Sequence, residues 1–425
     1  MENQKLKLKT KEFKGITLIA LVITIILLLI LAGVTIAALS GDNGILTRAK
    51  EAKEKTEQAQ KEEESTLTNM ENILGVYNFK NVNTKDTNPA GTVPENSTVI
   101  EADANKGIVI RDKNGNEWVW VEVPKTTVFT DLTIDTTKGL TEQNYTDIKN
   151  KLITYAIIYR EGALGQGRYW TDEWYEGCGL TSEEYTATYQ KMLKSIYTYG
   201  GFWIGRYETG IEGSIDDMSK ARTSLSSRIS LKTSPKAIIR KDAIPYNYVY
   251  CNEAEILAKE IAPNSNYTSS LMFGIQWDLA CKFLEAKGGL TTIDINSNST
   301  SWGNYNNAKI ENIISGKYAI YDGSILGAWT KISGLYTKQD LGNDYRAVLS
   351  TGISDYTKKM NIYDFAGNEW EWTLEHATID INSPCAGRGG YYGNSGSIHP
   401  AAKRVNNSIS YSYEYFGFRL TTYAN

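Results

Sequence analysis

The side chains that most often carry enzyme chemistry are scarce in this chain. Its 425 residues include only two histidines, His376 and His399, and four cysteines, at positions 178, 251, 281 and 385. So few histidines exclude chemistry that needs a histidine cluster, and the wide cysteine spacing excludes a zinc ribbon. The sequence also lacks the G-x-S-x-G, Walker and H-E-x-x-H motifs. We expect both histidines at the surface and the cysteines as buried free thiols, although their number allows two disulfides.

A dense polar and aromatic stretch lies near the C-terminus, between the motifs Arg-Gly-Gly at 388–390 and Gly-Phe-Arg at 417–419. Tyrosine offers a large contact area at low entropic cost, and Ser and Asn add adaptable hydrogen bonds, as in antibody loops. We therefore interpret the stretch as a binding face, with a coding bias toward Asn and Tyr as the alternative. Fourteen of the 25 residues from 391 to 415 are Tyr, Asn, Ser or His. These patch residues are Tyr391, Tyr392, Asn394, Ser395, Ser397, His399, Asn406, Asn407, Ser408, Ser410, Tyr411, Ser412, Tyr413 and Tyr415.

The first 39 residues predict a membrane anchor. Residues 16–39 are a run of 24 positions without a charge, long enough for a transmembrane helix. Residues 1–15 are a basic leader with five Lys and two Glu, which favours a cytoplasmic N-terminus and an extracellular C-terminal domain. The segment therefore predicts a single-pass protein of the cell membrane.

The same segment resembles the N-terminus of type IV pilins. In that family a basic leader ends in a glycine, here Gly15, a prepilin peptidase cuts after it, and the next residue, here Ile16, is methylated. The family usually carries Glu at the fifth mature position, where this chain has Ala20. The resemblance therefore implies a minor or tip subunit, or a processed anchor, with other pilin-like subunits as partners.

Two further segments precede the body of the protein. Residues 40–78 carry Lys and Glu four positions apart, as in Lys50/Glu54, and predict a charged helical stalk. The sequence "SGDNG" at 40–44 predicts a kink or interruption between the membrane helix and this stalk. Residues 79–106 are polar, contain two prolines, and predict a linker.

Residues 107–425 predict one α+β domain. Asn114-Gly115 between two alternating runs predicts a β-hairpin. Apolar spacing predicts helices within 251–262 and 276–289, two or so in the whole domain. The 10 Trp and 28 Tyr predict small antiparallel sheets held by aromatic packing. A net charge of −4 offers no general attraction to nucleic acid.

The ordered motifs of this domain resemble the formylglycine-generating-enzyme-like (sulfatase-modifying factor) family. They include "GFWIGRYETG" at 201–210, "GNEWEW" at 367–372, and the motifs at 388–390 and 417–419. The resemblance covers residues 107–425 and implies that family's subtype of the C-type lectin fold. It also implies a structural Ca²⁺ bound by Asn368 and Glu371, whose oxygen atoms suit the ion. The alternative is that Glu371 is an ion-pair partner of Arg388 or Arg419.

The catalytic groups of that family are missing at the matching positions. Its oxidase branch holds copper on two cysteines, and counting back from Gly417 places Ala401 and Gly396 there. Its sulfoxide synthases hold iron on histidines from an additional helical domain, and two histidines cannot supply three ligands. We therefore expect no copper and no enzymatic activity.

The patch also resembles the diversified segment of variable proteins from diversity-generating retroelements. Those proteins share the lectin-like fold, and adenine mutagenesis of their codons yields Asn, Tyr, Ser and His near a Gly-Phe-Arg motif. The resemblance implies a surface-displayed binding protein whose patch contacts an unknown protein or glycan. Two alternatives stay open: a divergent formylglycine-generating or nonheme-metal enzyme, and a minor pilin-like subunit.

Overall fold

The computed structural model describes residues 22–24, 53, 55–56, 58, 77–161, 169–222, 235–341 and 346–425. The chain divides into two units, residues 1–67 and 68–425. Most of the predicted leader, anchor and stalk lies outside the described residues, as do Gly15 and Ile16.

The predicted membrane localisation is contradicted by the helices of the structure. Within the ranges that the structure describes, no helix is both long enough and apolar enough to cross a membrane. The 18-residue helix α6 (Ser182–Tyr199), for example, carries Glu183, Glu184, Lys191 and Lys194. Charged side chains at such positions are costly in a bilayer.

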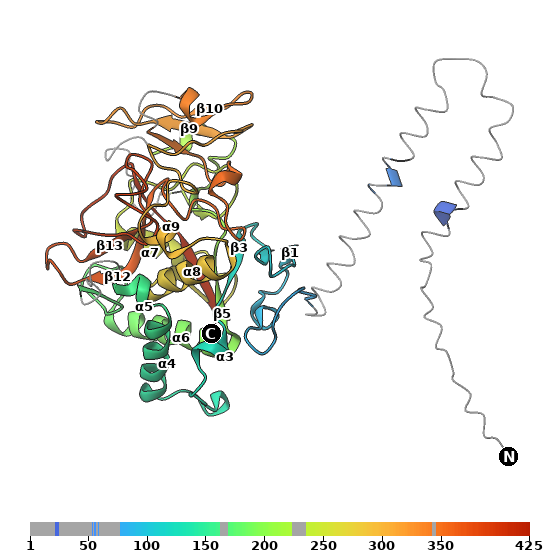
Figure 1. The fold of residues 1–425 in the computed structure, drawn as a ribbon, viewed down its shortest axis with the longest axis vertical. Helices are drawn as coiled ribbons and strands as arrows, with labels where there is room; N and C mark the ends of the chain where they lie inside the picture. Colours follow the sequence, from blue (N-terminus) through green and yellow to red (C-terminus); the bar gives the residue numbers. More distant parts are fainter. Residues whose placement is uncertain are drawn as a thin grey trace. The chain divides into compact units, whose positions relative to one another are not determined.

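The central sheet of the unit 68–425 has six antiparallel strands, and Figure 1 labels β1, β3 and β5 among them. Its strand order is β1-β2-β3-β5-β16-β8. The C-terminal strand β16 therefore lies between two strands from the middle of the chain. The bounds are β1 Thr98–Glu101, β2 Val109–Arg111, β3 Glu117–Glu122, β5 Gly201–Gly205, β8 Tyr267–Leu271 and β16 Leu420–Ala424.

The turn between β2 and β3 confirms the predicted hairpin. Val109 pairs with Val119 across the two strands, and Gly115 adopts a φ of 83° that favours glycine. The predicted linker, in contrast, is wrong, because residues 79–106 are part of the folded unit. They include β1 at the edge of the central sheet, and Trp203 donates a hydrogen bond to the hydroxyl of Thr92 at 3.0 Å.

A second sheet carries the C-terminal motifs. Its order is β14-β13-β12-β15, and β4 pairs with the far end of β12. Strands β12 and β15 are parallel, whereas β12 is antiparallel to β13 and β4. The bounds are β4 Trp170–Thr171, β12 Trp370–Ala377, β13 Cys385–Arg388, β14 Arg404–Asn407 and β15 Phe416–Phe418.

The remaining strands of the described residues form two smaller sheets. They contain β6 (Gly210–Ile211) with β7 (Ala237–Ile238), and β10-β9-β11, with β9 Lys317–Ile320, β10 Thr330–Lys331 and β11 Ala347–Leu349. In Figure 1 the strands β9 and β10 lie at one end of the unit, and the helices α4 and α6 lie at the other.

More helices form than the sequence predicts. The two predicted helices appear as α7 (Cys251–Lys259) and α8 (Gly274–Lys287). Apolar spacing did not indicate α4 (Glu142–Tyr155) or α6, although Thr181 and Glu184 form a capping box at the start of α6. The short helices are α3 Lys125–Val128, α5 Ile157–Glu161 and α9 Thr292–Asn296.

Helix α8 connects the two larger sheets, because it contacts β3 of the first sheet and β12 of the second. Its residue Trp277 is fully buried, as are Trp118, Trp203 and Trp372 of the sheets. The aromatic α+β core is therefore confirmed. All four cysteines are buried and free, as predicted.

Candidate functional site

Strand β12 positions the site, because its alternate side chains point to opposite faces. Trp370 and Trp372 pack on one face against Phe416 of β15, and the rings of Trp372 and Phe416 stack at 4.2 Å. Glu371 points the other way and forms an ion pair with Arg419 at 2.7 Å. Both partners are buried, so the predicted pair between Glu371 and the Gly-Phe-Arg motif is confirmed.

Aromatic patch residues gather around Trp370. His399 lies 5.0 Å from its ring, and Tyr391 stacks on it at 6.4 Å. Tyr391 in turn lies 4.8 Å from Tyr415, whose hydroxyl is hydrogen-bonded to that of Tyr411 at 2.7 Å. Segments on both sides of β14 therefore meet in one cluster. We call it the aromatic face: Trp370, Tyr391, His399, Tyr411, Tyr413, Tyr415 and Phe416.

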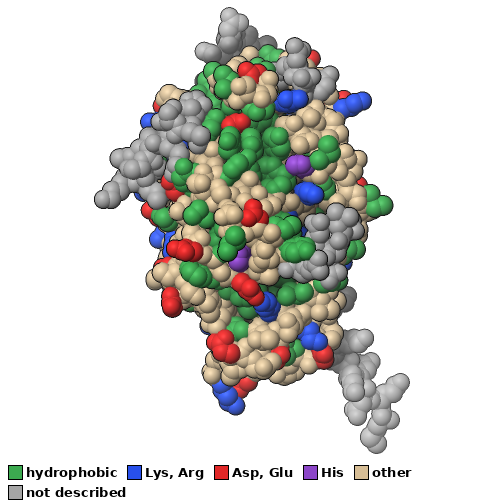
Figure 2. Space-filling view, turned by 90° about the vertical axis from the view of Figure 1, so that its left-hand side faces the viewer, with side chains coloured by type: hydrophobic (Ala, Val, Ile, Leu, Met, Phe, Trp, Pro, Cys, Tyr) green, Lys and Arg blue, Asp and Glu red, His purple; other side chains and the backbone are tan. Residues whose placement is uncertain are grey.

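The aromatic face has an exposed margin and a buried base. Tyr413 is 40% exposed, and Ile398 and Ile409 beside the patch are 59% and 44% exposed. Trp370 and Phe416 are buried. Figure 2 views the side of the unit that carries the C-terminal loops, and there hydrophobic side chains gather in an elongated patch. Half-buried rings with an exposed margin can contact a ligand with little loss of side-chain freedom.

The other predicted patch residues fall into three groups. Tyr392 and Ser412 are buried and are not part of the exposed surface. The serine pairs 395/397 and 408/410 each join their hydroxyls at 3.1 Å in surface turns, and Asn394 accepts a hydrogen bond from the amide of Ser395. Asn406 and Asn407 are successive residues of β14 and point to opposite faces. The predicted set is therefore not one continuous surface.

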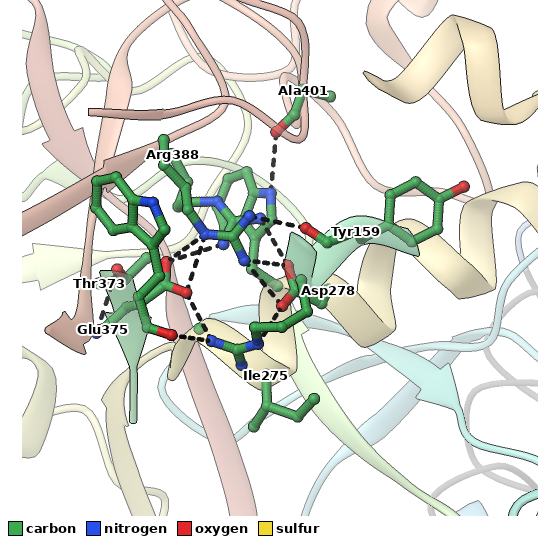
Figure 3. Close-up of polar contacts among 12 residues, drawn as sticks. Tyr159, Ile275, Asp278, Thr373, Glu375, Arg388 and Ala401 are labelled. Atoms are coloured by element: carbon green, nitrogen blue, oxygen red, sulfur yellow. Dashed lines mark hydrogen bonds and ion pairs between the residues drawn. The ribbon is translucent and has the colours of Figure 1, made fainter. Parts of the chain in front are cut away.

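A buried cluster of charges holds the base of the site (Figure 3). Arg388 of β13 contacts Asp278 of α8 at 2.8 Å and Glu375 of β12 at 2.9 Å. Arg404 of β14 contacts the same two carboxylates at 2.8 and 3.0 Å. A third arginine, Arg160 of α5, contacts both of these carboxylates and also Asp172. The cluster therefore contains three arginines and three carboxylates, and its charges balance.

The cluster fixes β13 and β14, the two strands at the ends of the first patch segment. Burial by itself raises the pKa of Glu375, but Arg404, Arg388 and Arg160 lower it to about 2. Glu375 is therefore ionised at neutral pH, and three opposed pairs satisfy one another away from water. The sequence motifs indicated Arg388 as an ion-pair residue but pointed to Glu371 as its partner. They gave no sign of the other members, Arg160, Asp172, Asp278, Glu375 and Arg404, whose spacing along the chain carries no signal.

The two predicted calcium ligands already have protein partners. The side-chain oxygen of Asn368 accepts hydrogen bonds from Asn304 at 2.8 Å and from the amide of Leu349 at 3.0 Å. Glu371 pairs with Arg419, as described above. Over the described ranges, no group of three or more His, Cys, Asp or Glu is arranged to hold a metal ion. The calcium site stays a prediction.

His399 is half-buried rather than free at the surface, and so is His376, whose ring lies 5.0 Å from Tyr175. Burial, followed by the positive charge of Lys403, lowers the pKa of His399 from 6.5 to about 4. The folded state therefore holds this imidazole neutral at pH values where the unfolded state binds a proton.

We expect the stability of the protein to fall as the pH is lowered from about 6.5 to about 4, because the unfolded state gains protons in this window and His399 does not. The change His399→Gln removes this contribution. Thermal unfolding between pH 7.5 and 4 should then show a shallower decline for the variant than for the original chain. Parallel curves would contradict the assignment.

Comparisons with known proteins leave the family open. No family model matches the chain, and no curated protein matches it. Among solved structures, Treponema denticola variable protein 1 is similar, with 15% identity over 73% of this chain and 85% of that one. The TM-score of this match is 0.22, which is too low to assign the fold. The structure itself establishes a mixed α+β unit, and the C-type-lectin-like fold stays a prediction.

Proposed function

We propose that this chain is a non-catalytic ligand-binding protein that uses the aromatic face, on a C-type-lectin-like fold, to contact a protein or a glycan. The observation that carries the proposal is the convergence of three segments, around Tyr391, His399 and Tyr411–Tyr415, on one partly exposed ring cluster. Aromatic residues with a polar margin are the usual composition of protein recognition sites.

The rigid support of this face is consistent with binding. Arg388 and Arg404, at the two ends of the first patch segment, both enter the buried charge cluster. The segments between such anchors can change their exposed side chains without altering the sheet. We therefore propose that the exposed patch residues are the diversified ones, while Tyr392 and Ser412 belong to the constant core.

The positions that match the copper cysteines support a non-catalytic role. Gly396 is buried, and a Cβ built on it would overlap the backbone nitrogen of Thr300. Ala401 is also buried, and its carbonyl accepts the hydrogen bond of the Trp277 indole at 3.0 Å. A cysteine side chain at position 396 would therefore displace the backbone at Thr300.

A binding screen with two matched variants tests the proposal. The full chain would be used to probe a glycan array and a displayed peptide library, and each ligand found would be titrated again with Tyr391→Ala and Tyr415→Ala. Truncation of a central aromatic anchor typically costs about 2 kcal/mol or more, so we expect affinity to fall by at least about 30-fold.

The control variant is Tyr145→Ala, because Tyr145 is a partly buried tyrosine of α4 that has no ring contact with the aromatic face. It should leave the affinity unchanged. Unchanged affinity in both face variants, with unfolding temperatures close to that of the original chain, would contradict the proposed site. Oxygen consumption with a cysteine peptide after copper loading would contradict the non-catalytic role.

A further inference from the structure

Two carboxylates lie behind the aromatic face without a cationic partner. Glu369, next to Trp370, is 1% exposed, and both of its carboxylate oxygens lack a hydrogen-bond partner. Glu414, between Tyr413 and Tyr415, is 5% exposed. Among the described residues, neither forms an ion pair. A buried carboxylate without a partner is costly, so this arrangement differs from the balanced cluster around Arg388.

Other buried polar atoms in the same region are also unsatisfied. The hydroxyls of Tyr392 and Ser412 and the side-chain oxygen of Asn247 have no hydrogen-bond partner. The amide nitrogen of Asn247 donates to the backbone oxygen of Glu414 at 3.0 Å, which places this side chain beside that residue. Buried polar atoms in folded proteins are normally paired. The oxygen atoms collected here are all acceptors or hydroxyls, and they suit a positively charged donor group.

Tyrosine rings surround the two carboxylates. The charges of Glu414 and Glu369 both raise the pKa values of Tyr392 and Tyr248, after the larger effect of burial. The ring of Tyr392 lies 5.6 Å from that of Tyr391 and 6.2 Å from that of Tyr321. Tyr391 belongs to the aromatic face, and the buried Tyr392 connects its ring to the acidic region. Aromatic rings attract cations through their faces, most strongly where water is excluded.

We propose that the aromatic face recognises an organic cation, an alkylammonium or guanidinium group of the ligand, whose charge is balanced by Glu414 and Glu369. This inference rests on the proposed function and specifies the chemistry of the ligand. The described positive groups in this region include Arg346, beside Tyr321 and Tyr391, and Lys403, beside His399. A third, the buried Arg222, lies over the ring of Tyr246 and donates to the backbone oxygen of Asn247 at 3.4 Å. None of the three is among the groups that shift the pKa of Glu369 or Glu414. Among the described residues neither carboxylate has a cationic partner, so both can pair with a cation of the ligand.

The test uses two small cations as probes of the full chain. Tetramethylammonium chloride and methylguanidinium chloride would be titrated separately at constant ionic strength, with ligand-observed NMR as the readout. We expect one of them to bind, and its identity distinguishes an ammonium source from a guanidinium source. The neutral isostere tert-butanol should not bind. Burial raises the pKa of both Glu369 and Glu414, and a bound cation favours their ionised form. Glu414→Gln and Glu369→Gln should each weaken binding of the probe by about tenfold, since each removes a group that can carry the opposing negative charge without changing shape.

The matched control is Glu183→Gln, an exposed carboxylate in the first turn of α6, which should leave binding unchanged. Equal binding of the cations and tert-butanol, or unchanged binding in both glutamine variants with intact unfolding curves, would overturn the inference. Binding of calcium chloride alone would also overturn it, in favour of an inorganic cation. If a ligand from the screen depends on Tyr415 but not on Glu414 or the probes, the cation inference fails and the binding face stands.

Discussion

Replacing Arg388 by methionine is expected to lower the free energy of unfolding by about 3–5 kcal/mol. The guanidinium is fully buried and contacts Asp278 at 2.8 Å and Glu375 at 2.9 Å. The variant leaves three buried carboxylates opposite two arginines, and one negative charge without a partner. Urea unfolding followed by tryptophan fluorescence measures the change. The loss exceeds that of an ordinary surface substitution because the group left behind cannot reach water.

A surface ion pair supplies the control for this prediction. Lys151 and Asp131 are 2.6 Å apart, but their side chains are 35% and 68% exposed. We expect Lys151→Met to change stability by less than about 0.5 kcal/mol, since exposed pairs contribute little. A loss below about 1 kcal/mol for Arg388→Met would show that the remaining arginines neutralise both carboxylates. The cluster would then not be what holds β13 to α8.

The second large effect is expected at Gly390, directly before the patch. Its φ of 82° lies in the left-handed region, and a Cβ there would overlap the carbonyl oxygen of His399 and lie 2.9 Å from the ring of Tyr305. Gly390→Ala combines backbone strain with a clash against backbone, and we expect a loss of about 3 kcal/mol. The clash falls on the loop that carries His399. Ligand binding should therefore decline together with stability.

A substitution at Gly289 distinguishes backbone strain from the clash. The φ of Gly289 is 69°, similar to that of Gly390, but no atom lies within 4 Å of the position that a Cβ would take there. Gly289→Ala should cost only the strain of the backbone, about 1 kcal/mol. Thermal unfolding of both variants compares the two losses directly. Equal losses would show that the loop at 390–399 moves aside, and that the face is less rigid than its contacts suggest.

Local patterns in the sequence determined a definite part of this protein. The hairpin at Asn114-Gly115 and the helices α7 and α8 follow from turn residues and apolar spacing within about 15 residues, where the chain has few alternatives. The ion pair between Glu371 and Arg419 could be predicted from the sequence because both residues belong to short motifs. The scarcity of histidine excluded whole classes of chemistry without any knowledge of the fold.

Tertiary structure alone decided which residues make the site. Arg404 donates to the backbone of Tyr159, 245 positions away, and Arg160 contacts Glu375 across 215 positions. The periodicity of apolar residues in the sequence does not indicate such pairs, because they form only when separate helices and strands pack. The patch residues show the same limit: their composition predicted a binding face, but strand alternation and burial decide that Tyr415 lines it and Tyr392 does not. Composition is a property of the chain, whereas exposure is a property of the packed fold.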